Sequence, residues 1–156
     1  MEKITKHHSK EDVKLHVKHV CEYAETINKV WTAAIELLRT KYDGKQLTKR
    51  FTDELNAKFA DDVIRCPDGR EFPNVSVSIS QGFSYKEIHI YLQRRSYSCG
   101  RGWVYIDREV YGTEVTLYPE FMDGCGHIIA DKLIPLIERT IDGNREKIFT
   151  MHLLNI

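Results

Sequence analysis

The most regular pattern in the chain is a repeat of apolar residues at alternating steps of four and three in its first forty positions. The repeat comprises Val13, Val17, Val20, Ala24, Ile27, Trp31, Ala34 and Leu38. This spacing places its members along one stripe of an α-helix, and neither Gly nor Pro interrupts the segment from Ser9 to Thr40. The sequence therefore predicts a first helix of about 30 residues, about 45 Å long at 1.5 Å per residue.

The next segment predicts a second helix that turns back on the first. The sequence YDGK at 42–45 carries a turn dipeptide, and Phe51, Leu55 and Phe59 then recur every four residues. The two helices should form a hairpin. From Val63 the pattern changes, because RCPDGREF places a Pro-Asp-Gly turn between two short extended pieces.

Residues 74–118 alternate between apolar and polar positions and predict an antiparallel meander of about four strands. The predicted strands are NVSVSIS, KEIHIYLQR, WVYID and EVTLYP. Strict alternation is typical of strands with one buried face. The side chains expected on that buried face are Val75, Val77, Ile79, Ile88, Ile90, Val104, Ile106, Val115 and Leu117.

The last part of the chain is rich in Ile and Leu and predicts helices. A helix should begin near His127, be kinked or restarted at Pro135 and end at IDGN, with REKIFTMHLL as a final short helix. The whole order predicts a single α+β domain over 1–156. It has an N-terminal helical hairpin with a long first helix, a central antiparallel meander, and C-terminal helices packed on one sheet face.

Composition narrows the class of protein. With 42% hydrophobic and 29% charged residues the chain has the composition of a globular protein. Its 23 basic and 23 acidic residues balance, so no overall positive charge attracts nucleic acid or anionic membranes. No apolar run approaches the roughly 18 residues of a membrane span, and the N-terminus does not resemble a signal peptide. We expect a cytoplasmic protein with reduced cysteines and no membrane partner.

The motifs of catalysis and metal binding are not evident in the sequence. His16 and His19 share one side of the first helix, and Cys125 lies two residues before His127, but neither pair belongs to a full zinc set. The sequence has no nucleophile elbow and no phosphate-binding loop. It predicts no catalytic residue, no metal ligand and no cofactor.

One enzymatic alternative stays open. Carboxylates cluster near the predicted strand ends, at Asp107, Glu109, Glu114 and Asp123. With a histidine such as His89 they would suit a small metal-dependent phosphodiester hydrolase.

The second face of the predicted sheet carries the strongest functional pattern. Alternation directs aromatic and uncharged side chains to this face, and arginines lie at its rim. The predicted binding residues are His89, Tyr91, Gln93, Arg94, Arg95, Tyr97, Arg101, Trp103, Tyr105 and Arg108. We expect a non-catalytic protein-binding module, such as an inhibitor, adaptor or small regulator. Binding of single-stranded nucleic acid through the same surface is the alternative. Two structural alternatives also stay open: Trp103 and Tyr105 lie inward with Val104 outward, or the Tyr and Trp side chains serve ordinary cross-strand pairing.

The four-three repeat of the first helix allows a homodimer as a further alternative. The contacts would come from Val13, Val17, Val20, Ala24, Ile27 and Trp31. Alanines and a tryptophan pack poorly in a two-stranded coiled coil, however, so the sequence favours packing of this stripe within its own chain.

Overall fold

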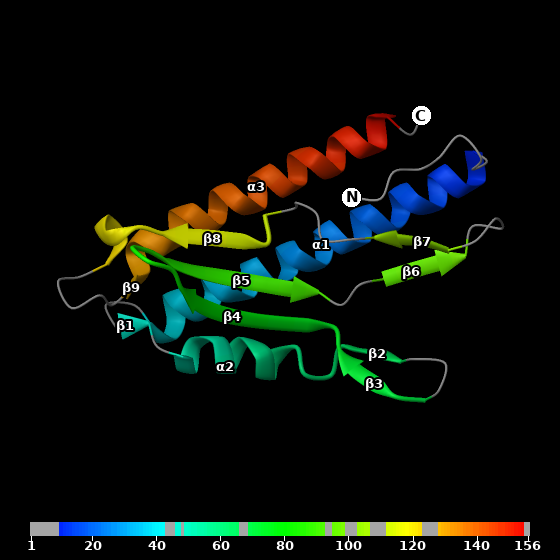
Figure 1. The fold of residues 1–156 in the computed structure, drawn as a ribbon. Coiled ribbons are helices and arrows are strands. Elements are labelled where there is room, and N and C mark those ends of the chain that lie inside the picture. The colour runs from blue at the N-terminus through cyan, green and yellow to red at the C-terminus, as the bar shows by residue number, and fades with distance from the viewer. Residues whose placement is uncertain are drawn as a thin grey trace.

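The computed structural model describes residues 10–42, 46–47, 49–65, 69–92, 95–98, 103–106, 112–122 and 128–154 (Figure 1). The helices are α1 (Lys10–Lys41), α2 (Lys49–Lys58), the short 3-10 helix Pro119–Phe121 and α3 (Ala130–Leu154). The strands are β1 (Gln46–Leu47), β2 (Val63–Arg65), β3 (Glu71–Pro73), β4 (Val75–Gln81), β5 (Lys86–Leu92), β6 (Arg95–Ser98), β7 (Trp103–Ile106), β8 (Glu114–Leu117) and β9 (Ile128–Ile129). The predicted α+β class is confirmed.

An antiparallel sheet of three strands, in the order β4-β5-β8, forms the centre of the fold. Val77 lies opposite Ile90, and Ile88 lies opposite Val115. Apolar side chains that face the core alternate with polar ones along all three strands, as the sequence predicts, but the polar His89 between Ile88 and Ile90 is buried as well. The buried apolar residues are Val75, Val77, Ile88, Ile90, Val115 and Leu117, and Ile79 is partly buried.

The predicted four-strand meander is corrected by the strand pairing. Strand β8 pairs directly with β5, while β7 pairs with β6 in a separate ladder. In the first ladder His89 pairs with Glu114, and in the second Arg95 pairs with Ile106. The chain advances six residues from His89 to Arg95 but eight from Ile106 to Glu114. The two ladders therefore do not share one register, because an antiparallel ladder needs equal spacing on both strands.

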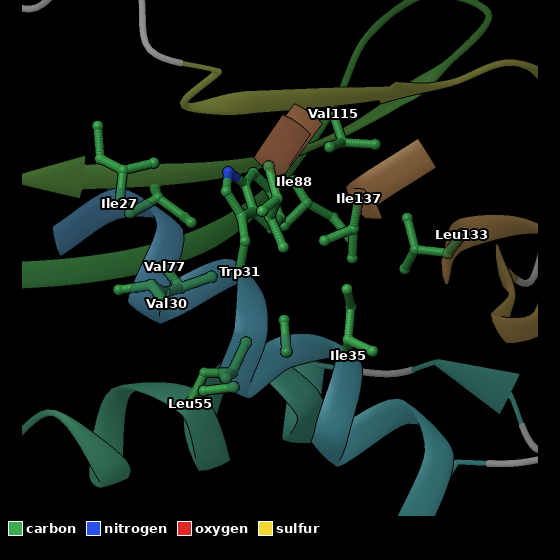
Figure 2. Close-up of a cluster of buried hydrophobic side chains, with 14 of the residues drawn as sticks. Ile27, Val30, Trp31, Ile35, Leu55, Val77, Ile88, Val115, Leu133 and Ile137 are labelled. Carbon is green, nitrogen blue, oxygen red and sulfur yellow. The ribbon is translucent and has the colours of Figure 1, made fainter. Parts of the chain in front are cut away.

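Helix α1 is the central element of the hydrophobic core. Figure 2 shows Ile27, Val30, Trp31 and Ile35 of α1 packed among residues from the other helices and the sheet. Their labelled neighbours are Leu55 of α2, Val77, Ile88 and Val115 of the sheet, and Leu133 and Ile137 of α3. The Trp31 indole N–H also donates a hydrogen bond to the Gly112 carbonyl.

The apolar repeat of α1 is therefore used inside the chain. Val17, Val20, Ala24, Ile27 and Trp31 are all buried, which agrees with the internal packing that the sequence favours. The Val13 side chain lies outside the described residues. A homodimer through this stripe would require removing the stripe from its own core.

Helix α2 links the C-terminal end of α1 to the edge strand β4. The Tyr42 ring packs edge-on against Phe51 with the ring centres 5.6 Å apart. The Asn56 side chain accepts a hydrogen bond from the Val77 N–H at 2.7 Å and donates one to the Val77 carbonyl at 2.9 Å. These bonds satisfy backbone groups on the edge strand β4, which would otherwise face solvent.

The C-terminal region is one helix, which corrects the prediction of two. Helix α3 runs through both Pro135 and Gly143. Pro135 lies in the second turn, where it removes one backbone hydrogen bond. Gly143 lies between Ile141 and Asn144, which are buried against the rest of the fold, so tertiary packing overrides the turn signal of IDGN.

None of the helices in the described part of the chain combines the length and the apolar character that a crossing of the bilayer needs.

Candidate functional site on the outer sheet face

The face of the three-stranded sheet opposite the core is polar, and we call it the outer sheet face. Its residues follow from the strand register and from the alternation of buried positions. They are Ser76, Ser78 and Ser80 of β4, Glu87, His89 and Tyr91 of β5, and Glu114 and Thr116 of β8. Ser76, Ser80, Tyr91 and Glu114 are exposed, so no described part of the chain covers these positions.

His89 lies at the centre of this face and is nevertheless only 7% exposed. Its Nε2 atom is 2.8 Å from Glu87 Oε2 and 2.9 Å from the hydroxyl oxygen of Ser80. Its Nδ1 atom is 3.1 Å from Glu114 Oε1. The ring stacks on Tyr91, with centres 5.5 Å apart and planes inclined by 10°. Neighbouring side chains on the same face therefore bury the imidazole.

The 2.8 Å contact with Glu87 assigns the proton of a neutral imidazole to Nε2, because an ionised carboxylate only accepts hydrogen bonds. Nδ1 is then an unprotonated acceptor. Within the described part of the chain it has no hydrogen-bond partner, because the Glu114 oxygen is close but out of line.

Two tyrosines border this polar centre and are open to solvent. Tyr91 is 48% exposed beside His89, and Tyr118, just beyond the end of β8, is 52% exposed. The Tyr118 ring leans on Tyr85 at a centre-to-centre distance of 6.4 Å. The outer sheet face thus combines a buried polar cluster with exposed aromatic surface.

The structure brings together only part of the predicted binding set. His89 and Tyr91 are in contact on β5. Gln93, Arg94, Arg101 and Arg108 lie outside the described residues. For Arg95, Tyr97, Trp103 and Tyr105 the structure describes the backbone of β6 and β7 but not the side chains.

The register of the β6–β7 ladder divides this last group between two faces. Tyr97 pairs with Val104, and Ser98 pairs with Trp103. Cross-strand partners belong to the same face of an antiparallel ladder, and successive residues alternate. Arg95 and Tyr97 are thereby assigned to one face, and Trp103 and Tyr105 to the other.

Sequence reasoning missed the carboxylates of the outer sheet face. The description of this face as uncharged is wrong, because Glu87 and Glu114 both approach His89. Glu87 was detectable, since alternation places it two residues before His89 on the same side of the strand. Glu114 was noted as a strand-end carboxylate, but its position beside His89 depends on the pairing of β5 with β8.

The other histidines and cysteines give no comparable arrangement among the described side chains. His19 Nδ1 is 3.6 Å from Glu22 Oε2 on the same helix. Cys21 is buried, and burial, followed by the nearby Glu25 and Glu22 carboxylates, raises the pKa of its thiol. A raised pKa lowers the thiolate fraction, which is the opposite of what a nucleophilic cysteine needs.

Comparisons with protein-family models, with curated proteins and with solved structures find no match to this chain. Function is therefore inferred from the chemistry of the outer sheet face.

Proposed function

We propose that the protein is a non-catalytic binding module that holds another protein on the outer sheet face. The observation that carries the proposal is a pair of half-exposed tyrosines, Tyr91 on the outer sheet face and Tyr118 just beyond the end of β8. Tyrosine is enriched at protein interfaces, because its ring buries a large apolar area and its hydroxyl still finds a polar partner. Such a module would act as an inhibitor, adaptor or small regulator.

The charge of the face indicates the chemistry of the partner. Glu114 has a side chain that is 56% exposed, and Glu87 lies across His89 from it. A partner segment that carries Lys or Arg between apolar anchors would meet both the tyrosine rings and the carboxylates. Complementary charge of this kind contributes more to the rate of association and to specificity than to affinity.

Single-stranded nucleic acid is the competing occupant of the same surface. Bases stack on exposed aromatic rings, but the accompanying phosphates would approach the Glu114 carboxylate. The described centre of the face therefore favours a protein partner.

The proposal is tested by affinity capture from the native cell lysate, with each lysate divided into nuclease-treated and untreated halves. The test variant carries both Tyr91→Ala and Tyr118→Ala. The matched control is Phe149→Ala, which removes an aromatic ring that is 63% exposed on α3, away from the outer sheet face. Circular dichroism confirms that each variant is folded.

We expect a stoichiometric protein to be captured by the wild type and by Phe149→Ala in both halves. Its recovery should fall at least tenfold with the double tyrosine variant, as hot-spot aromatics dominate binding energy. Equal recovery with the double variant would contradict the proposal. Loss of all binding on nuclease treatment, with nucleic acid in the untreated half, would establish the competing function.

A further inference from the structure

The geometry around His89 points to a second property of the outer sheet face. We propose that His89 Nδ1 and Glu114 bind a divalent transition-metal ion, and that Glu87 orients the imidazole through Nε2. This inference does not depend on the identity of any protein partner. It rests on the positions of three side chains from β5 and β8.

The Nδ1 atom of His89 is buried without a hydrogen-bond partner among the described residues. The atom is shielded from solvent and belongs to a side chain that is more than nine-tenths buried. Buried polar atoms without a partner are uncommon, because each gives up its hydrogen bonds to water without replacing them. Glu114 Oε1, 3.1 Å from Nδ1, is itself an acceptor. With the ring proton on Nε2, neither atom gives the other a hydrogen bond, and a metal cation bound between them would satisfy both.

The distance between His89 Nδ1 and Glu114 Oε1 fits two ligands of one ion. Ligand atoms about 2.0–2.1 Å from a zinc ion in tetrahedral geometry lie roughly 3.3 Å from each other. Nδ1 and Glu114 Oε1 are 3.1 Å apart. The oxygen also lies out of line for a hydrogen bond to the ring, which is the arrangement that two ligands of one ion adopt.

On the opposite side of the ring, His89 Nε2 contacts a carboxylate. Histidines that bind metals generally donate their other ring N–H to a carboxylate or carbonyl, which fixes the tautomer and the orientation of the ring. Glu87 Oε2 makes this contact with Nε2 at 2.8 Å. One ligand atom from each of Glu87, His89 and Glu114 lies within 4.8 Å of the other two.

The donor set indicates the class of metal. One imidazole nitrogen with carboxylate oxygen suits Zn²⁺, Mn²⁺ or Fe²⁺, whereas Mg²⁺ and Ca²⁺ prefer oxygen ligands alone. The exposed side of Glu114 leaves coordination positions open to water or to a group from a bound partner. The ion would therefore occupy an open site at the sheet surface.

The test begins with protein stripped of metal by chelation and titrated with Zn²⁺ and with Mn²⁺ in a calorimeter. Mg²⁺ serves as the comparison ion. In parallel, ¹⁵N spectra of the imidazole rings identify the nitrogen that changes on Zn²⁺ addition. We expect a proton on Nε2 of His89 before addition and a large shift of the Nδ1 resonance after it.

The variants separate a ligand from an orienting residue. Glu114→Gln should weaken Zn²⁺ binding at least 100-fold, since an amide oxygen is a poor replacement for a charged ligand. Glu87→Gln keeps an acceptor for Nε2 and should weaken binding about tenfold. His152→Ala removes an exposed histidine near the end of α3 and should leave the titration unchanged.

Three results would overturn the proposal. The first is no binding of either transition metal, with ¹⁵N spectra that show protons on both nitrogens of His89, because a proton would then lie between Nδ1 and Glu114. The second is undiminished Zn²⁺ binding by Glu114→Gln. Because the Glu114 side chain is exposed, this variant should fold, so a loss of binding would report the loss of a ligand. The third is a Zn²⁺-dependent shift at Nε2 only. Partner capture repeated with chelator shows separately whether the binding proposal needs the metal.

Discussion

Asn144 is buried in the interface between α1 and α3, with only 1% of its surface exposed. Its amide donates to Asn28 Oδ1 at 2.8 Å, and Asn28 donates in turn to the Ile141 carbonyl at 3.2 Å. Asn144→Ala removes one partner and leaves the Asn28 oxygen without its hydrogen bond. We expect a loss of about 1–3 kcal/mol in the free energy of unfolding, measured by urea denaturation. Asp142→Ala, an exposed change two residues away, should cost less than about 0.5 kcal/mol, and equal losses would contradict the role of the amide pair.

Two buried acids make the protein sensitive to alkaline conditions. Burial raises the pKa of Cys21 above its ordinary value of 9.0 and the pKa of Tyr42 above 10.0, with Glu54 adding to the shift at Tyr42. As the pH rises through the ordinary values, the unfolded chain loses these protons while the folded protein retains them. The contribution of these two groups to the free energy of unfolding is fully present below about pH 9 and declines above it.

The measurement is the free energy of unfolding at pH 7.5 and at pH 10.5. Tyr42→Phe keeps the edge-on ring contact with Phe51 and removes the titrating hydroxyl. The difference in stability between the two pH values should be smaller in this variant than in the wild type. An unchanged difference would exclude Tyr42 as a source of the alkaline loss.

At this scale the sequence predicts burial well and contacts poorly. Alternation correctly assigns Val77, Ile88 and Val115 to the core. It also places His89 on the outer sheet face, but the contact of this ring with Glu114 arises only through pairing with a later strand. Contacts of this kind are set by register, which no local pattern specifies.

Among the elements, α3 contains a glycine in an interior turn. A Cβ atom added at Gly143 would meet nothing within 4 Å, and the residue is helical. Gly143→Ala should therefore stabilise the protein by about 0.5–1 kcal/mol, because alanine loses less conformational entropy in a helix. Thermal unfolding followed by circular dichroism measures the change.

Gly112 provides the opposite case. Its φ angle is +55°, and an added Cβ would collide with Thr140 Cγ2 of α3. Gly112→Ala should destabilise the protein, since both the backbone conformation and the space favour glycine. If both alanine variants changed stability in the same direction, the helical assignment of Gly143 or the packing at Gly112 would be wrong.

The elements also show where sequence patterns reach their limit. The long uninterrupted repeat of α1 predicts that helix almost to its ends. IDGN reads locally as a stop, yet the buried Ile141 and Asn144 continue the helix through it. The meander was predicted as four strands because periodicity identifies extended segments and not their partners.

Across the whole molecule, α1 connects the other helices to the sheet, so we predict a single cooperative unfolding transition. Ile27 is completely buried in the core that these elements share. Ile27→Ala should cost about 2–5 kcal/mol. The transition monitored by tryptophan fluorescence and the one monitored by far-UV circular dichroism should shift together. Two separate transitions would contradict the prediction of one domain over 1–156.

The pairing of Asn28 with Asn144 also fixes the alignment of α3 along α1. A slide of one helical turn, about 5.4 Å, would separate the two amides and leave both buried without partners. Apolar contacts alone would resist such a slide less, because similar side chains recur along both helices. The helical layer behind the sheet is therefore held in one register, and a partner on the outer sheet face would bind to a rigid support rather than shift the helices beneath it.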